Sequence, residues 1–198
     1  MDEIFTPRLR LRPFQEADFA ALFAMHQRPE VSRWLGNGEM PSEAQTRARL
    51  AVYRQPLAAP GAILAITPRQ ATDDATFYGT VLLKPIPLSA GEAAETLFEV
   101  GWHLHPDYWH QGYATEAAAA LLARAEAAGL PQVVAVTWPD NLRSQAVMRR
   151  LGMVRVGLSR RFYDAETLLF VRRFIAIHSK FYTKSNAEGD TWLHGETT

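Results

Sequence analysis

One turn constrains the fold of this chain more than any other stretch, because it joins a predicted strand to a predicted helix. The turn contains Gly112, and the alanine-rich helix predicted over Thr115–Ala128 ends at Gly129 and Pro131. The first backbone amides of a helix have no partner within the helix, and the helix dipole is positive there. The turn is therefore suited to an anion such as a pyrophosphate, although a glycine beside a helix start is more often plain capping.

Hydrophobic periodicity assigns most of the remaining chain to strands and helices. Strands are predicted at 8–12, 61–67, 77–84, 96–104, 132–138, 154–158 and 167–174, and helices at 16–27, after Ser42, and from Asn141 to Arg150. Ser42 and Gln45 have the spacing of a capping box. The first strand is predicted to be a short edge strand with one solvated face. Hairpins followed by alternating strands and helices predict an α+β fold, a mixed sheet with helices on its faces.

Composition predicts one globular domain over 1–175, followed by a polar tail at 176–198. The chain has 198 residues, 47% of them hydrophobic, which is enough to bury a core in one domain. It has no cysteine, which excludes disulfides, thiolate metal sites and a cysteine nucleophile. No apolar run approaches the ~20 residues that span a bilayer, and no targeting segment is recognised. We therefore expect a cytoplasmic protein without a membrane partner.

The charge distribution gives no reason to expect a nucleic-acid partner, because 21 basic residues balance 21 acidic ones. The balance is uneven, however. Residues 141–173 contain eight arginines against only Asp164 and Glu166. A phosphorylated ligand would suit this region, and a solvated basic face is an equally open interpretation.

Four segments together resemble a known family. Gln111 and Gly112, followed by the alanine-rich helix, are similar to the acetyl-coenzyme A (acetyl-CoA) pyrophosphate loop of the GNAT superfamily of N-acetyltransferases. Residues 97–109, 141–153 and 6–13 resemble its Rim-type branch, which acetylates the N-termini of ribosomal proteins. The resemblance implies the GNAT fold, with a mostly antiparallel central sheet splayed between two parallel strands, helices on both faces, and the pantetheine arm of acetyl-CoA in the split.

The resemblance also implies cofactor-binding residues: His103, Leu104, Gln111, Gly112, Tyr113, Ala114, Thr115, Asn141 and Ser144. It also allows a homodimer by analogy. Two positions depart from the family pattern. His110 stands where a second glycine is common, and Met148 stands where many relatives have a tyrosine that protonates the leaving thiolate. The acid is therefore open, with Ser144 or a bound water as candidates.

Glu99 is the candidate general base. Alternation along 96–104 places it on one strand face with Gly101 and His103. An amine attacks a thioester only when neutral, so a carboxylate that takes its proton, directly or through water, assists the reaction. The structural alternative is an edge-facing carboxylate paired with an arginine.

His103 and His105 share a strand face, but two histidines without a third ligand do not predict a metal site. A structural hydrogen-bonding role is more typical. If the two strands of the family's split separate near His103 and Leu104, a freed backbone N–H there would bind the thioester oxygen as negative charge develops.

These residues predict direct transfer of acetyl from acetyl-CoA to a primary amine, with Glu99 and Ser144 as catalytic residues. The favoured acceptor is a protein or peptide N-terminus. A small amine, such as an antibiotic or polyamine, and a non-catalytic CoA-binding module of the same fold are the alternatives. Four aromatic residues could line an acceptor cleft, although a core position is favoured for each: Trp34, Tyr53, Trp109 and Trp138.

Overall fold

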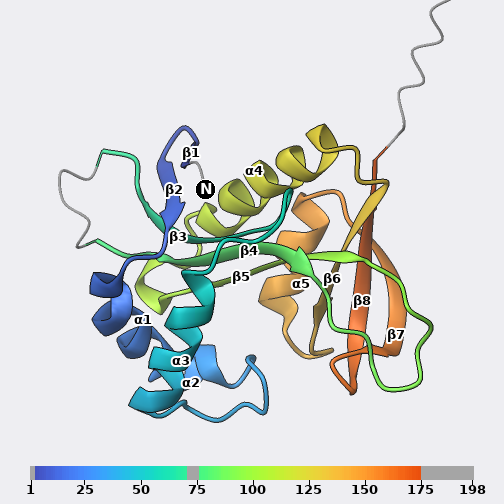
Figure 1. Ribbon diagram of the computed structural model, residues 1–198, viewed down its shortest axis with the longest axis horizontal. Coiled ribbons are helices and arrows are strands. Elements are labelled where there is room, and N and C mark those ends of the chain that lie inside the picture. The colour runs from blue at the N-terminus through green and yellow to red at the C-terminus, as the bar shows by residue number, and fades with distance from the viewer. Residues whose placement is uncertain (1–2, 71–75, 175–198) are drawn as a thin grey trace, which may run out of the picture.

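The computed structural model describes residues 3–70 and 76–174, and these form an eight-stranded sheet with helices packed around it (Figure 1). The strand order is β1-β2-β3-β4-β5-β6-β8-β7. The strands are β1 (Ile4–Phe5), β2 (Leu9–Pro13), β3 (Ala62–Pro68), β4 (Gly79–Pro85), β5 (Phe98–Leu104), β6 (Gln132–Thr137), β7 (Val154–Phe162) and β8 (Ala165–Arg173). The helices are α1 (Phe19–His26), α2 (Pro29–Ser32), α3 (Glu43–Tyr53), α4 (Tyr113–Ala127) and α5 (Leu142–Arg150), with 3-10 turns η1 (Glu16–Asp18) and η2 (Pro106–Tyr108).

Local sequence explains where the helices begin. The Ser42 hydroxyl accepts a hydrogen bond from the Gln45 amide and the Gln45 side chain accepts one from the Ser42 amide, so the predicted capping box starts α3. Asn141 caps α5 in a similar way, because its Oδ1 accepts the Ser144 amide at 3.2 Å. Gly112 precedes α4 with φ of 81°, a left-handed conformation that glycine adopts without strain.

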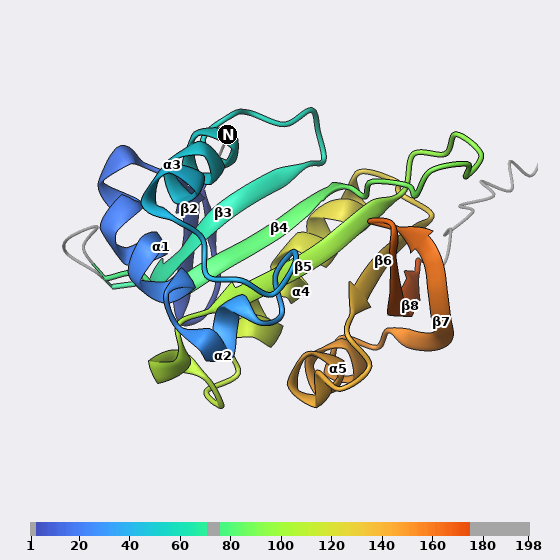
Figure 2. The same cartoon turned by 90° about the horizontal axis from the view of Figure 1, so that it is seen from below.

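Helices cover both faces of the sheet, as the two views in Figures 1 and 2 show. Helix α4 packs on the face that carries Leu64, Val81 and Val100, and Met148 of α5 joins the same hydrophobic cluster. The N-terminal helices cover the opposite face, where Leu22 and Leu50 form a second hydrophobic cluster with Ile63 and Ala65 of β3. The predicted α+β class, with a mostly antiparallel sheet and helices on both faces, is confirmed.

The sheet contains one parallel pair, β5 and β6, and this pair is splayed. Strands β4 and β5 are in antiparallel register over seven residue pairs, whereas β5 and β6 share one registered pair, Glu99 with Val134. Beyond that pair the two strands diverge toward their carboxyl ends, which Figure 2 shows with α5 beside the opening. The predicted split therefore exists, and it opens from Glu99 onward.

Strand β2 corrects one expectation. The sequence predicted an edge strand with a solvated face, but β1 flanks β2 and the Arg12 side chain is only 1% exposed. Two nitrogens of Arg12 bond the two carboxylate oxygens of Asp18 at 2.8 and 2.7 Å, so a paired arginine occupies a position that looked polar and exposed. The predicted tail at 176–198 lies outside the described residues. In the part of the chain that is described, no helix is long and apolar enough to cross a membrane.

Candidate active site

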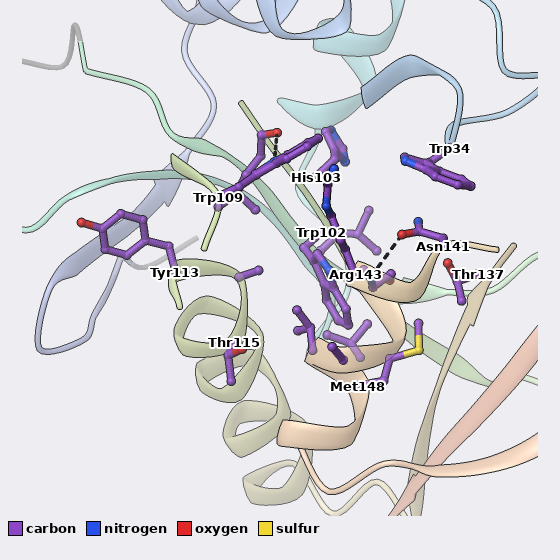
Figure 3. Close-up of a pocket in the computed structure, with 18 of the residues that line it drawn as sticks. Trp34, Trp102, His103, Trp109, Tyr113, Thr115, Thr137, Asn141, Arg143 and Met148 are labelled. Carbon is purple, nitrogen blue, oxygen red and sulfur yellow. Dashed lines mark hydrogen bonds between the residues drawn. The ribbon is translucent and has the colours of Figure 1, made fainter. Parts of the chain in front are cut away.

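The split between β5 and β6 opens into a cavity of about 1370 Å³ (Figure 3). One wall is the end of β5 with the turn and first residues of α4, and the other is the end of β6 with α5. The predicted residues His103, Leu104, Asn141 and Ser144 line this cavity, as does the whole predicted stretch 111–115. The structure therefore brings together every cofactor-binding residue that the sequence nominated.

The start of α4 is built to receive an anion. The amides of Tyr113, Ala114 and Thr115 have no acceptor among the described residues, because the first bond of the helix joins the Glu116 amide to the Gly112 carbonyl at 3.0 Å. The Thr115 hydroxyl is also buried without a hydrogen-bond partner. Tyr113, Ala114 and Thr115 line the cavity, so their unpaired amides fit a phosphate group.

Two backbone conformations explain the turn before α4. His110 has φ of 62°, which accounts for the glycine that relatives commonly place at this position. Gly112 has φ of 81°, and a Cβ atom added there would lie 3.3 Å from Arg8 Nη2. A side chain at Gly112 would thus strain the backbone and lie in close contact with the Arg8 guanidinium.

Arg8 fixes this turn from the start of the chain. Its Nε donates to Glu116 Oε2 at 2.7 Å, and its Nη1 donates to the Gln111 carbonyl at 2.9 Å. Burial alone would raise the pKa of Glu116, but hydrogen bonds from Thr6 and Arg8 outweigh burial and lower that pKa. The charge of Glu116 is therefore balanced by Arg8, and the α4 amides remain available to a ligand.

Helix α5 supplies the opposite wall. Ser144 lines the cavity one turn before Met148, whose side chain is buried at 1% exposure and has no proton to donate. The guanidinium of Arg143 lies 4.7 Å from the ring centroid of Trp109, whose Nε1 donates to the Leu104 carbonyl at 2.8 Å (Figure 3). Arg143 and Arg150, from the predicted basic stretch, are the arginines of that stretch that line the cavity.

Glu99 lies in the central part of the sheet, 6% exposed, and borders the cavity. Its Oε1 is 2.6 Å from Lys84 Nζ, and the Tyr163 hydroxyl donates to the same oxygen. Burial first, and then the charge and hydrogen bond of Glu99, raise the pKa of Tyr163, so this phenol stays protonated. The carboxylate is neither at an edge nor paired with an arginine. Sequence reasoning missed both partners.

His103 borders the cavity and is partly buried beside His26, with ring centroids 5.1 Å apart. Burial, reinforced by His26 and Arg49, holds the pKa of His103 well below its ordinary value. Its Nε2 is buried without a partner. The neutral, desolvated imidazole is therefore a poor proton acceptor. Within 3–70 and 76–174, no cluster of three or more metal-ligating side chains occurs.

The backbone at the end of β5 is better placed than the His103 ring. The His105 amide bonds the Tyr78 carbonyl of the neighbouring chain segment at 2.9 Å, and hydrogen-bonded pairs recur every second residue in an antiparallel ladder. This alternation directs the N–H groups of Trp102 and Leu104 toward β6, where the strands have separated. Leu104, rather than His103, therefore presents its amide to the split.

Aromatic residues surround much of the cavity. Trp34, Trp109 and Trp138 line it, whereas Tyr53 packs against the His103 ring, at 6.4 Å between centroids, and is a core residue. Trp102 also lines the cavity and was not among the sequence candidates. Its position on β5, facing α4, follows from the same alternation that placed Glu99 on the other face.

Comparison with known proteins gives the family. The sequence model of the acetyltransferase (GNAT) domain matches residues 8–154. The chain belongs to the GNAT acetyltransferase family. Two curated relatives of this GNAT protein come from Bacillus subtilis (strain 168). The uncharacterized N-acetyltransferase YoaA is 25% identical over 162 residues, 79% of this chain and 85% of YoaA. The uncharacterized N-acetyltransferase YnaD is 39% identical over 64 residues, 32% of this chain and only 38% of YnaD.

Solved structures agree on the fold of this GNAT domain. An acetyltransferase from Agrobacterium tumefaciens superposes with a TM-score of 0.68 at 27% identity, over 88% of this chain and 95% of that one. An acetyltransferase from Salmonella typhimurium, described as modifying the N-terminal serine of ribosomal protein L7/L12, gives 0.67 at 17% identity, over 88% and 100%. The family match and the relatives' names support an N-acetyltransferase.

Proposed function

We propose that this protein transfers the acetyl group of acetyl-CoA to the α-amino group of a protein or peptide N-terminus. The observation that carries the proposal is the position of Glu99. Its carboxylate borders the same cavity as the unpaired amides at the start of α4. A proton acceptor and an anion-binding helix end therefore border one space of about 1370 Å³, large enough for a cofactor and an acceptor together.

Acetyl-CoA supplies an activated thioester, and the residues of the chain hold it and move a proton. We assign the phosphates to the amides of Tyr113, Ala114 and Thr115. Gln111 and Gly112 shape the turn. The Leu104 amide, on the open side of β5, is the donor we assign to the thioester oxygen.

The reaction balances with one base and one proton donor. The amine nitrogen forms a bond to the acetyl carbon, the bond from that carbon to sulfur breaks, and the amine loses a proton to Glu99. The sulfur takes up a proton, and the products are an amide and a thiol. Met148 cannot supply that proton, so we assign it to Ser144 or to water. A thiol with an ordinary pKa near ~8.5 needs little acid assistance.

The α-amino group of an N-terminus suits this site because its ordinary pKa of ~7.7 to 8.0 leaves a sizeable neutral fraction at physiological pH, whereas a lysine at ~10.4 has little. The Salmonella protein that matches this fold is described as acting on an N-terminal serine, which supports the same acceptor class. Small amines are the alternative acceptors. A panel of N-terminal peptides and polyamines, read by mass spectrometry for the gain of one acetyl group, separates the two classes.

Replacing Glu99 with glutamine tests the base. General-base assistance contributes ~10² to 10⁴-fold, so we expect Glu99→Gln to lower kcat by at least the smaller factor. The Kd for acetyl-CoA, measured by calorimetry, should remain within about threefold, because the amide replaces a group that does not hold the phosphates. The deficit should shrink as pH rises, because hydroxide then delivers the neutral amine.

The matched control is Glu43→Gln, which makes the same replacement in an exposed ion pair with Arg47 on α3 and should retain the wild-type kcat. A Glu99→Gln enzyme with wild-type rates across the pH range would refute the assignment. A protein that binds acetyl-CoA but acetylates no amine on the panel would instead be a non-catalytic CoA-binding module.

A further inference from the structure

We infer that Tyr163 and Lys84 are positioning residues that anchor one oxygen of Glu99 and leave its other oxygen to accept the amine proton. The inference rests on the proposed role of Glu99 as the base. It goes beyond that role by assigning separate tasks to the two carboxylate oxygens and by naming the side chains that enforce them.

The evidence begins with the asymmetry of the carboxylate. Lys84 Nζ lies 2.6 Å from Oε1 of Glu99, and the Tyr163 hydroxyl donates to the same oxygen. Lys84 Nζ also donates to the Tyr163 oxygen at 2.9 Å, so the three polar groups form a closed triangle. Among the described residues, no donor reaches Oε2, and Oε2 is not one of the fully buried unpaired atoms. Because Glu99 lines the cavity, Oε2 is the oxygen that we assign to the amine.

Strand register delivers Lys84. In the antiparallel β4–β5 ladder Lys84 is directly opposite Glu99, and side chains of opposed residues lie on one face of the sheet. The next position along this face of β5 is Gly101, and the side chain of its partner Leu82 lies over it, since a Cβ atom added at Gly101 would be 3.1 Å from Leu82 Cδ1. Lys84 is thus the charged side chain that the β4 register places against Glu99.

A hairpin turn delivers Tyr163. Tyr163 and Asp164 connect β7 and β8 with φ of 62° and 51°, a left-handed conformation that non-glycine residues rarely adopt. Such a conformation persists when the surroundings determine it. The Asp164 amide donates to Ser89 Oγ at 3.0 Å, the Ala90 amide donates to Asp164 Oδ1 at 2.9 Å, and the Tyr163 amide donates to the Pro87 carbonyl at 3.3 Å.

The same hairpin is held by charge. Arg161, two residues before Tyr163, pairs with Glu92 at 3.2 Å and with Glu95 at 3.0 Å in the loop that leads into β5. The hairpin and the loop are thus joined on both sides of the turn. A tyrosine 64 residues away in sequence is held in place beside Glu99, and its pKa, raised by burial and by Glu99, keeps it a donor.

Tyr163→Phe tests the anchor because it removes one hydroxyl and keeps the ring and the backbone demand of the turn. Losing one of two anchors lets the carboxylate rotate, so we expect kcat to fall roughly tenfold while the Kd for acetyl-CoA stays within about twofold. In a Glu99→Gln background the same change should alter kcat by less than about twofold, because the group that it positions is already absent.

Lys84 provides a second route to the same answer. Lys84→Met should lower kcat in the wild-type background only, and Lys84→Arg should recover part of the loss because it restores a cation opposite Glu99. The control is Arg160→Gln, which removes an exposed ion pair with Glu166 on the same hairpin and should retain the wild-type kcat.

The outcomes separate the two proposals. A Glu99→Gln enzyme with full activity overturns the base, and the anchor with it. A slow Glu99→Gln enzyme beside a fully active Tyr163→Phe enzyme overturns the anchor alone. Equal losses from Tyr163→Phe in both backgrounds, with a matching fall in melting temperature, would make Tyr163 a structural residue of the hairpin and likewise overturn the anchor.

Discussion

The buried histidine pair predicts an acid-sensitive fold. His26 and His103 lie against each other between β5 and the N-terminal helices, and the charged group nearest to them is a cation, Arg49, whose Nη1 is 3.4 Å from His26 Nδ1. Burial, and then Arg49, lower the pKa of His26 from 6.5 to about 4, and the pKa of His103 is also far below 6.5. The His26 ring is therefore neutral in the folded protein at pH 5, and the lowered pKa of His103 disfavours its protonation in the same direction.

The sign and size of the effect follow from proton linkage. Below pH 6.5 the unfolded chain binds protons at both histidines and the folded chain does not, so stability is complete above 6.5 and falls as pH drops toward 4. Each pH unit in this window costs about 1.4 kcal/mol per histidine. At pH 5.0, 1.5 units below 6.5, His26 alone therefore costs about 2 kcal/mol, a sizeable part of the roughly 5–15 kcal/mol that typical domains have, and His103 adds a cost of the same sign.

Urea denaturation at pH 7.5 and pH 5.0 measures this cost, and His26→Gln isolates the contribution of His26. The glutamine does not titrate, so the difference between the two unfolding free energies should be about 2 kcal/mol smaller in this variant. The control is His105→Gln, because His105 is outside the pair and its Nδ1 accepts the Asp107 amide. If His26→Gln and wild type lose the same free energy on acidification, the buried neutral pair is wrong.

Two further predictions concern the cofactor turn and the N-terminal strand. Gly112→Asp should weaken acetyl-CoA binding at least tenfold by calorimetry, because it adds a negative charge beside the unpaired α4 amides at φ of 81°, whereas Gln111→Ala should change the Kd by less than about threefold. Equal small effects would mean that the phosphates bind elsewhere. Asp18→Ala should cost about 3–5 kcal/mol in urea denaturation, because it leaves Arg12 buried without its carboxylate, while Glu16→Gln, in an exposed ion pair, should cost under about 1 kcal/mol. A loss at Asp18 no larger than at Glu16 would contradict the buried pair.

Local sequence patterns predicted the helix starts, because capping depends on residues that are neighbours in the sequence. The capping residues Ser42 and Asn141 start their helices where the sequence placed them, and Gly112 precedes α4 as expected. The cavity-lining positions of the α4 turn and of α5 followed from these starts, because a helix end fixes which residues face the ligand. Strand alternation gave the face on which Glu99 lies, and its candidacy as the base came mainly from the resemblance to a family that often has a glutamate on this strand.

Tertiary pairings were outside the reach of such patterns. Arg12 looked exposed because nothing in its neighbourhood indicates that Asp18 turns back to meet it. Tyr163 was assigned to a turn, correctly, but its contact with Glu99 depends on a hairpin that packs against the loop at 87–90. Lys84 could have been found, since β4 and β5 are neighbours in the sequence, but only once their register was known.

The splay between β5 and β6 has a consequence for engineering. A sheet that shares one registered pair between two of its central strands has given up ladder bonds to make room for a ligand. Substitutions that tighten this seam would gain backbone pairing at the expense of the space for acetyl-CoA, so stabilising changes belong at the far hairpins and helix caps. Acetyl-CoA itself fills this space when it binds, so the melting temperature of the protein should rise with the acetyl-CoA concentration.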